Sequence, residues 1–267
     1  LKILEQERVE HLQKLREQHA QLRELDELKS RFVSNVSHEL RTPLAVIKLY
    51  ATLARKGRPE KQTYYLRTIE QETHRLETMV ENILDLTRMD RQVLRVHPEL
   101  LEAEEIVERV LEVYEETALK KGVELLNQVP GGLPALWVDK NHLIQILTNL
   151  VDNALKYSHR GGKVWVAARE MGSGAERTLE IAVGDTGIGI PKDELGQVFE
   201  RFYRGSNNTP GSTGTGLGLA IVRELMVRHG GRVSLESEEG QGSVFTLQFP
   251  LYEGEAPPEV SNEFDDA

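Results

Sequence analysis

The sequence predicts a chain of two parts, an all-α helical hairpin followed by an α/β sandwich domain. Two observations predict the hairpin: residues 1–42 contain neither glycine nor proline, and apolar residues recur there at spacings of three and four. A third observation predicts the sandwich, because strand-like runs alternate with helical patterns after about Arg95. With 267 residues, 39% of them hydrophobic, the chain has enough apolar material for both cores.

The hairpin is expected from two long helical patterns with a short connection. The first covers residues 1–42 and resumes after Pro43, where a kink is expected because proline removes a backbone donor and clashes with an earlier carbonyl. Gly57 and Pro59 interrupt the pattern, and a second one covers residues 65–86. A single hairpin has nothing opposite its apolar stripe, so we expect a homodimer in which two hairpins form a four-helix bundle.

The two ends of the chain differ in composition from the parts between them. Residues 1–29 are rich in Glu, Arg, Lys and Gln but interrupt a strict heptad, and the last 17 residues carry six acidic and no basic residues, which is typical of disorder. We therefore expect a signalling helix or coiled-coil linker (1–29), a dimerisation domain (30–95), the sandwich domain (96–250) and an acidic disordered tail (251–267).

Within the sandwich domain the patterns are shorter and mixed. Helices are expected over 103–121, around 144–151 and over 220–229, and strands over 123–126, 136–138, 163–168, 178–183, 232–236 and 243–249. Nine of the 22 glycines fall within residues 184–218. This concentration predicts a mobile loop framed by tight turns.

Charge and composition exclude several classes of function. The net charge of −10 and pI of about 5.4 argue against nucleic acid and anionic membrane as partners, although a local cationic pocket for one nucleotide remains open. The absence of cysteine excludes a thiol nucleophile and a zinc–thiolate site, and it favours the cytoplasm. No apolar run of 18 residues occurs. Since the sequence starts without Met, we expect a fragment of a longer protein.

The first group of candidate catalytic residues lies in segment 37–43, Ser-His-Glu-Leu-Arg-Thr-Pro. His38 and Thr42 are four residues apart and share one helical face. A neutral imidazole can act as a nucleophile because its unperturbed pKa is about 6.5, and Glu39 can accept its other proton. The alternative is an ordinary surface histidine on a polar helical face.

The second group lies on the helix around residue 150. Asn149 and Asn153 are one turn apart on an otherwise aliphatic helix, although asparagine is a mediocre helix former. Amide oxygens suit a magnesium ion that also holds phosphates, and Lys156 can add positive charge. The alternative is a polar stripe that faces water.

Two glycine motifs complete the candidate binding site. Asp185 follows an aliphatic strand, where its carboxylate can accept a hydrogen bond from an amino group, and Gly187 and Gly189 allow close approach to a flat ligand. The loop 214–219 precedes a helix whose N-terminal donors suit a phosphate. This loop is neither a dinucleotide-fold fingerprint nor a P-loop.

Taken in order, segments 37–43, 149–158, 185–190, 199–204 and 214–219 resemble the transmitter core of a sensor histidine kinase of a two-component system. The resemblance runs from about residue 28 to 250, and it implies that the chain is the cytoplasmic portion of a membrane-anchored receptor. It implies a phosphoacceptor dimerisation hairpin and an ATP-binding domain of the type found in gyrase, the Hsp90 chaperone and MutL, an α/β sandwich with a flexible lid. One departure is the segment Gly184-Asp185-Thr186, where a bulkier acidic or polar residue and an asparagine are commoner around the aspartate.

The resemblance also implies a role for individual residues. His38 would be the phosphorylated residue, Glu39 its general base, and Thr42 a residue that helps to remove phosphate from the partner protein. Asn153 would bind magnesium with Asn149 nearby, and Asp185 would recognise adenine. The nucleotide would be surrounded by Lys156, Tyr157, Gly187, Gly189, Arg204, Gly214, Thr215, Gly216, Leu217 and Gly218, with Phe199 and Phe202 anchoring the lid and Arg201 a second candidate beside Arg204 for the terminal phosphate.

The function expected from these motifs is an ATP- and Mg²⁺-dependent protein-histidine kinase. It would phosphorylate His38, pass the phosphoryl group to an aspartate in the receiver domain of a response regulator, and act as a phosphatase for that regulator as a further possibility. Two alternatives stay open: a stand-alone ATPase, and a non-catalytic nucleotide-binding dimeric scaffold of the same fold. Segment 37–43 argues against the ATPase, and the intact motifs argue against the scaffold.

Overall fold

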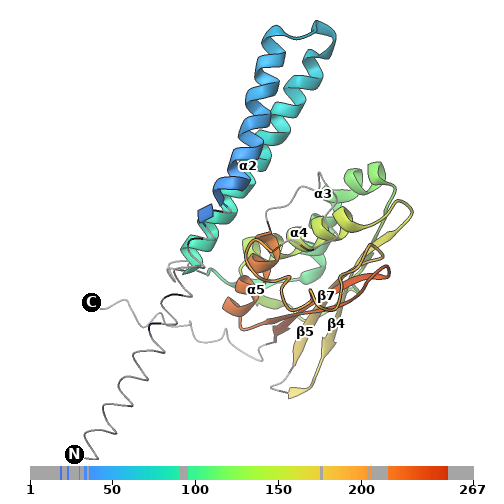
Figure 1. The fold of residues 1–267 in the computed structure, drawn as a ribbon. Coiled ribbons are helices and arrows are strands. Elements are labelled where there is room, and N and C mark those ends of the chain that lie inside the picture. The colour runs from blue at the N-terminus through green and yellow to red at the C-terminus, as the bar shows by residue number, and fades with distance from the viewer. Residues whose placement is uncertain are drawn as a thin grey trace, which may run out of the picture. The chain divides into compact units, whose positions relative to one another are not determined.

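The computed structural model describes residues 19, 23, 30, 33–34, 36–90, 96–174, 177–203, 205 and 216–251, with the side chains of residues 85, 86 and 88–90 excepted. The chain divides into two compact units, Leu1–Glu81 and Asn82–Ala267. Figure 1 shows the corresponding architecture, a helical hairpin and an α/β domain. Among the described residues, no helix has the length and apolar character needed to cross a membrane.

The hairpin consists of a helix over residues 36–56 and the helix α2 (Gln62–Asp90), joined through the 3₁₀ turn η1 (Pro59–Lys61). The first helix is continuous through Pro43, and it ends at Gly57, whose N–H donates to the carbonyl of Leu53 at 2.6 Å. The predicted hairpin is therefore confirmed.

Aromatic side chains close the hairpin at the connecting end. The ring centroids of Tyr50, Tyr64 and Tyr65 lie 5.9 to 6.0 Å apart, and Tyr65 is buried. Along the two helices, however, large apolar side chains remain 45% to 59% exposed. These side chains are Val33, Leu44, Leu49, Tyr64, Leu66, Val80 and Leu84.

The second unit is built on a mixed five-stranded sheet with the strand order β2-β4-β5-β7-β6. Strands β2 and β4 pair in parallel, and the other neighbours are antiparallel. A separate two-stranded sheet pairs β1 with β3. The strands are β1 (Glu99–Leu101), β2 (Glu124–Gln128), β3 (Leu136–Val138), β4 (Lys163–Met171), β5 (Thr178–Asp185), β6 (Arg232–Glu238) and β7 (Gly242–Pro250).

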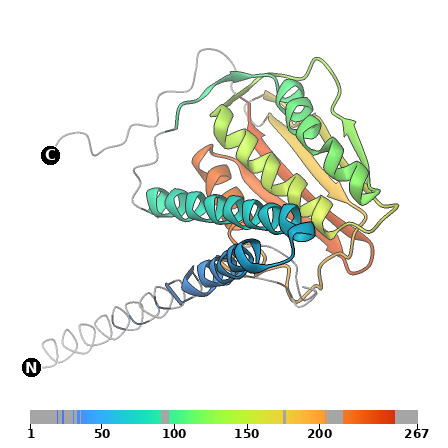
Figure 2. The same ribbon diagram turned by 90° about the horizontal axis from the view of Figure 1, so that it is seen from above.

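Three helices cover one face of this sheet: α3 (Ala103–Lys121), α4 (Lys140–Tyr157) and α5 (Gly218–Arg228) (Figures 1 and 2). Alternate residues of β4, β5 and β7 point into the core beneath them, among them Val164, Ile181 and Leu247. The residues between them, such as Trp165, lie on the face without helices. The predicted α/β sandwich is thus confirmed.

The structure explains the unusual glycine at position 184. Gly184 pairs with Trp165 across β5 and β4, and a Cβ atom added at Gly184 would lie 2.2 Å from Cζ2 of that indole. The ring of Trp165 occupies the space that a side chain at position 184 would need. A glycine at position 184 therefore suits the packing of this indole against β5.

Several sequence-based expectations differ from the structure or fall outside it. The helix expected over 220–229 begins earlier, at Gly218, and the short strand β1 had no sequence signal. Leu251, which we had placed in the tail, is buried in the core, and its N–H donates to the carbonyl of Arg177. The rest of the tail (252–267), Arg204, Gly214, Thr215 and nearly all of the linker 1–29 lie outside the described residues.

Candidate functional site

The segment around His38 lies on the first helix of the hairpin, as expected. The side chain of His38 is exposed. The hydroxyl of Thr42 donates to the carbonyl of His38 at 3.3 Å, and that of Ser37 donates to the carbonyl of Val33 at 2.8 Å. Both hydroxyl groups are bonded to the backbone of their own helix, and the imidazole stands in solvent beside them, accessible to a reaction partner.

Glu39 points toward the other helix of the hairpin. Its Oε2 lies 3.9 Å from Nη2 of Arg75, and Nη1 of Arg75 lies 3.6 Å from Oε2 of Glu72. The three side chains are only 21% to 24% exposed. Arg75 therefore helps to orient the carboxylate expected to act as a base, and nothing in the sequence pattern pointed to Arg75.

In the second unit, α4 begins with a strong cap. Oδ1 of Asp139 accepts the N–H groups of Asn141 and His142 at 2.9 and 3.2 Å, and Oδ2 accepts the N–H of His97 at 2.9 Å. These N–H groups hold the pKa of Asp139 below its ordinary value, although burial opposes them. The cap fixes the start of the helix that carries both candidate asparagines.

Asn149 and Asn153 are both half-buried on α4. Nδ2 of Asn149 donates to the carbonyl of Gln145 at 2.9 Å, and its Oδ1 lies 2.8 Å from the place a Cβ of Gly218 would occupy. The structure thus brings this asparagine against the first residue of α5. In the part of the chain that the structure describes, the amide of Asn153 has no recorded hydrogen bond, so its oxygen is available as a metal ligand.

Asp185 ends β5 and is 6% exposed. Its Oδ1 accepts the N–H of Gly187 at 2.8 Å. Burial raises the pKa of Asp185 to about 6, against the opposing effect of the N–H groups of Gly187 and Ser243. A buried carboxylate of this kind gains from any ligand that donates a hydrogen bond to it.

The loop after Asp185 is fixed to the end of α4 and to the turn between β6 and β7. The N–H of Ile188 donates to the carbonyl of Tyr157 at 3.2 Å, and the carbonyl of Ile188 accepts the N–H of Gly240 at 2.7 Å. Gly189 has φ +65°, and a Cβ there would lie 2.0 Å from the carbonyl oxygen of Glu238. A glycine is required at this position, because any side chain would push the turn away.

The aromatic segment before the glycine-rich loop contacts the residues that follow it. The N–H of Phe202 donates to the carbonyl of Gly216 at 2.8 Å, and both residues have positive φ angles, 64° and 67°. Phe199 packs edge-on against Phe245 with ring centroids 6.2 Å apart. Leu217, expected around the nucleotide, has a fully buried side chain, so only its backbone remains available to a ligand.

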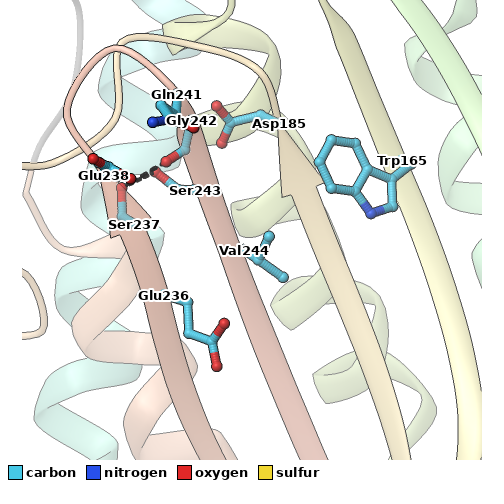
Figure 3. Close-up of a pocket in the computed structure, with 9 residues that line it drawn as sticks. All are labelled: Trp165, Asp185, Glu236, Ser237, Glu238, Gln241, Gly242, Ser243 and Val244. Atoms are coloured by element: carbon cyan, nitrogen blue, oxygen red, sulfur yellow. Dashed lines mark hydrogen bonds between the residues drawn. The ribbon is translucent and has the colours of Figure 1, made fainter.

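An open pocket of about 340 Å³ lies next to Asp185, but on the face of the sheet without helices (Figure 3). Trp165 and Val244, which line it, alternate with core residues and so point away from α4 and α5. The lining residues are Trp165, Asp185, Glu236, Ser237, Glu238, Gln241, Gly242, Ser243 and Val244. This pocket is therefore separate from the helix-covered side where Asn149 meets Gly218.

The predicted nucleotide residues that the structure describes all belong to the second unit, where Asn149 meets Gly218 and Tyr157 meets the loop after Asp185. The ammonium of Lys156 lies over the ring of Tyr157, 4.8 Å from its centroid. Among the described residues no group of three or more His, Asp or Glu side chains could hold a metal ion. Asparagine amide oxygens are hard ligands of the kind that suits Mg²⁺. His38, Glu39 and Thr42 belong to the hairpin.

A hairpin with an accessible histidine, followed by an α/β domain with a buried aspartate and paired asparagines, defines the core of a histidine kinase. Residues 28–92 match the family model described as the His Kinase A (phospho-acceptor) domain. Residues 138–253 match the model described as Histidine kinase-, DNA gyrase B-, and HSP90-like ATPase. The chain belongs to the sensor histidine kinases of two-component systems and carries both domains of their core.

Known relatives agree with this assignment. The chain is 34% identical to the sensor histidine kinase WalK of Bacillus subtilis, over 86% of this chain and 38% of WalK. It is 32% identical to the adaptive-response sensory kinase SasA of Synechococcus elongatus, over 89% of this chain and 63% of SasA. The structure of full-length ShkA in complex with AMPPNP is similar at 30% identity and a TM-score of 0.61, over 81% of this chain and 45% of ShkA. The chain spans less than two thirds of each of these relatives.

Proposed function

We propose that this chain is an ATP-dependent kinase that phosphorylates its own His38. The observation that supports this most directly is the meeting of α4, the Asp185 loop and the start of α5 in a domain linked to an exposed, helix-borne histidine. The domain boundaries that we propose, 30–95 and 96–250, overlap the matched regions 28–92 and 138–253.

ATP is the proposed substrate of the second unit. The buried carboxylate of Asp185 would accept a hydrogen bond from the adenine amino group, and Lys156 would place its charge near the phosphates. The N-terminal N–H groups of α5 suit an anion, and the missing side chain of Gly218 leaves room for the amide of Asn149 beside them. The relative ShkA, crystallised with AMPPNP, supports a nucleotide ligand.

Magnesium is the proposed cofactor, and the half-buried amide oxygen of Asn153 would hold it, with Asn149 nearby. When bound, the ion supplies positive charge that is spread over the phosphates during transfer. The half-buried setting of both amides fits a hard cation that keeps water and phosphate among its ligands.

In the transfer step, the unprotonated imidazole nitrogen of His38 attacks the terminal phosphorus of ATP in line. A P–N bond forms, the P–O bond to ADP breaks, and ADP leaves. The proton on the other ring nitrogen passes to the carboxylate of Glu39, which Arg75 helps to orient. The product is a phosphoramidate on His38.

We further propose a homodimer and a response-regulator partner. The exposed apolar side chains of the hairpin, 45% to 59% accessible, would be covered by the hairpin of a second copy. The phosphoryl group of His38 would pass to an aspartate in the receiver domain of the regulator. The hydroxyl of Thr42, one turn from His38, would orient water when the regulator is dephosphorylated.

The chain offers a matched control for testing the phosphorylated residue. His74 is also an exposed histidine of the hairpin, with its side chain 84% accessible. With γ-labelled ATP and Mg²⁺, we expect a label that is stable in base and lost in acid. His38→Gln should abolish this label while ATP binding stays intact, and His74→Gln should leave it unchanged.

The same experiment separates the alternatives. Release of free phosphate without any label on the protein would favour a stand-alone ATPase. Binding of ATP with neither label nor phosphate release would favour a scaffold. A label retained in His38→Gln would refute the assignment of the phosphorylated residue.

A further inference from the structure

The last turn of α4 carries residues of the proposed nucleotide site, and its carbonyl groups need partners. The final four carbonyls of any α-helix have no partner within the helix. In α4 the carbonyl of Ala154 accepts both the N–H and the hydroxyl of Ser158, at 3.1 and 2.7 Å. The carbonyl of Tyr157 accepts the N–H of Ile188 at 3.2 Å. Two carbonyls, those of Leu155 and Lys156, remain to be satisfied.

Both remaining carbonyls are bonded by one side chain from another helix. The ammonium of Lys121, the last residue of α3, donates to the carbonyl of Leu155 and, at 2.6 Å, to that of Lys156. Lys121 lies 34 and 35 positions before these residues in the sequence. Every C-terminal carbonyl of α4 therefore has a donor.

A cation at this place also suits the electrostatics of the helix. The C-terminal end of a helix carries partial negative charge, which a positive group stabilises. The side chain of Lys121 is half-buried, and burial lowers its pKa, with Lys156 acting in the same direction and Asp152 against it. The contact thus joins a charge to two carbonyls in a partly dehydrated place, where such bonds are strong.

The shape of the proposed nucleotide site depends on the last turn of α4. The turn bears Asn153, Lys156 and Tyr157, and the carbonyl of Tyr157 holds the loop that follows Asp185. If the carbonyls of Leu155 and Lys156 lost their donor, the turn would fray and loosen both groups of residues.

We propose that Lys121 is a positioning residue for nucleotide binding, which fixes the last turn of α4 through the carbonyls of Leu155 and Lys156. The proposal rests on the kinase function given above. Lys121 contacts the end of the helix that carries the proposed nucleotide residues, so we expect its effect on ATP binding rather than on the transfer step.

The test compares Lys121→Met with the neighbouring Lys120→Met in the full chain. Methionine keeps most of the apolar stem of Lys121 but donates no hydrogen bond. Lys120 is 68% exposed and pairs with Glu116 at 2.6 Å on the surface of the same helix. In autophosphorylation with Mg·ATP, Lys121→Met should raise KM for ATP about tenfold and leave kcat within about twofold, because two charge-assisted hydrogen bonds are lost. Lys120→Met should change neither.

A second pair of measurements separates positioning from a general loss of stability. Lys121→Arg, which can also donate to two carbonyls, should restore a large part of the affinity. Hydrogen exchange at the amides of Ser158 and Ile188 should speed up in Lys121→Met, while the amides of β6 keep the wild-type rate.

The possible failures are distinguishable. If wild-type protein takes up no label, the proposed kinase function fails. If wild type labels and Lys121→Met has the wild-type KM, or if exchange at Ser158 and Ile188 is unchanged, the inference about Lys121 is refuted. The inference is also refuted if Lys121→Arg fails to recover ATP affinity although it unfolds at the same denaturant concentration as wild type.

Discussion

Replacing Asp185 by asparagine should stabilise the ligand-free protein at neutral pH and weaken nucleotide binding. The carboxylate of Asp185 is buried, and its pKa is raised from 3.8 to about 6. The folded protein therefore binds this proton more tightly than the unfolded chain does. The stabilisation from protonation is fully present below pH 3.8 and is lost as the pH rises through about 6.

The size of the effect follows from the displacement of this pKa. At pH 5, one unit below the folded pKa, protonation favours the folded state about tenfold, or about 1.4 kcal/mol, whereas at pH 8 this contribution is close to zero. Asparagine keeps an oxygen that can accept the N–H of Gly187 and carries no charge at either pH. The free energy of unfolding of Asp185→Asn, relative to wild type, should therefore increase by about 1.4 kcal/mol between pH 5 and pH 8.

Denaturant unfolding followed by tryptophan fluorescence measures this difference in the free energy of unfolding. The signal reports on the second unit, because both tryptophans of the chain, Trp137 and Trp165, lie in that unit. Asp139→Asn is the matched control: the pKa of Asp139 is lowered, so the titration of this carboxyl itself lies below pH 5 and adds nothing between pH 5 and pH 8. A stability difference for Asp185→Asn that stays constant or shrinks as the pH rises would refute the reasoning. ATP affinity should meanwhile fall at least about tenfold, because a charged acceptor is lost.

Further substitutions test the packing around the site. Gly184→Ala should destabilise the second unit by about 1–3 kcal/mol in denaturant unfolding, since its Cβ would lie 2.2 Å from the ring of Trp165. Combining it with Trp165→Val should recover most of this loss. If the effects of the two substitutions were simply additive, a direct clash between the two residues would be contradicted. Gly216→Ala adds a Cβ 2.7 Å from the backbone of Phe202 at φ +67°, so ATP affinity by calorimetry should fall; wild-type affinity would count against it. Asp139→Ala removes the cap of α4 and should lower the free energy of unfolding by about 1–2 kcal/mol in denaturant unfolding. An unchanged free energy of unfolding would show that other groups cap the helix.

Much of the fold follows from local patterns in the sequence. The helix expected over 103–121 and the strand expected over 136–138 coincide with α3 and β3. Helix α3 ends where Gly122 adopts the left-handed conformation, a signal that a single residue can carry. Strand β1 escaped prediction because its residues are mostly exposed, without a buried apolar pattern, and it exists through its pairing with β3.

The candidate site was predictable to the extent that its residues cluster in short motifs. Asp185 and Gly187 are two positions apart and form a hydrogen bond, so the motif and the contact coincide. The contact between Asn149 and Gly218 joins two motifs that are nearly 70 positions apart. The motifs themselves do not predict this contact, and only the family resemblance suggested it. Leu217 shows the limit of this approach, because its motif position gave no indication that its side chain is fully buried.

The sequence by itself determined most of the segments that form helices and strands, and which short motifs carry the proposed chemistry, because periodicity and turn residues act over a few positions. Only the tertiary structure decided that Arg75 faces Glu39, that Trp165 fills the space beside Gly184, and that Lys121 holds the end of α4. Each of these contacts joins residues at least 19 positions apart, and which groups meet across such a distance depends on how whole helices and strands pack.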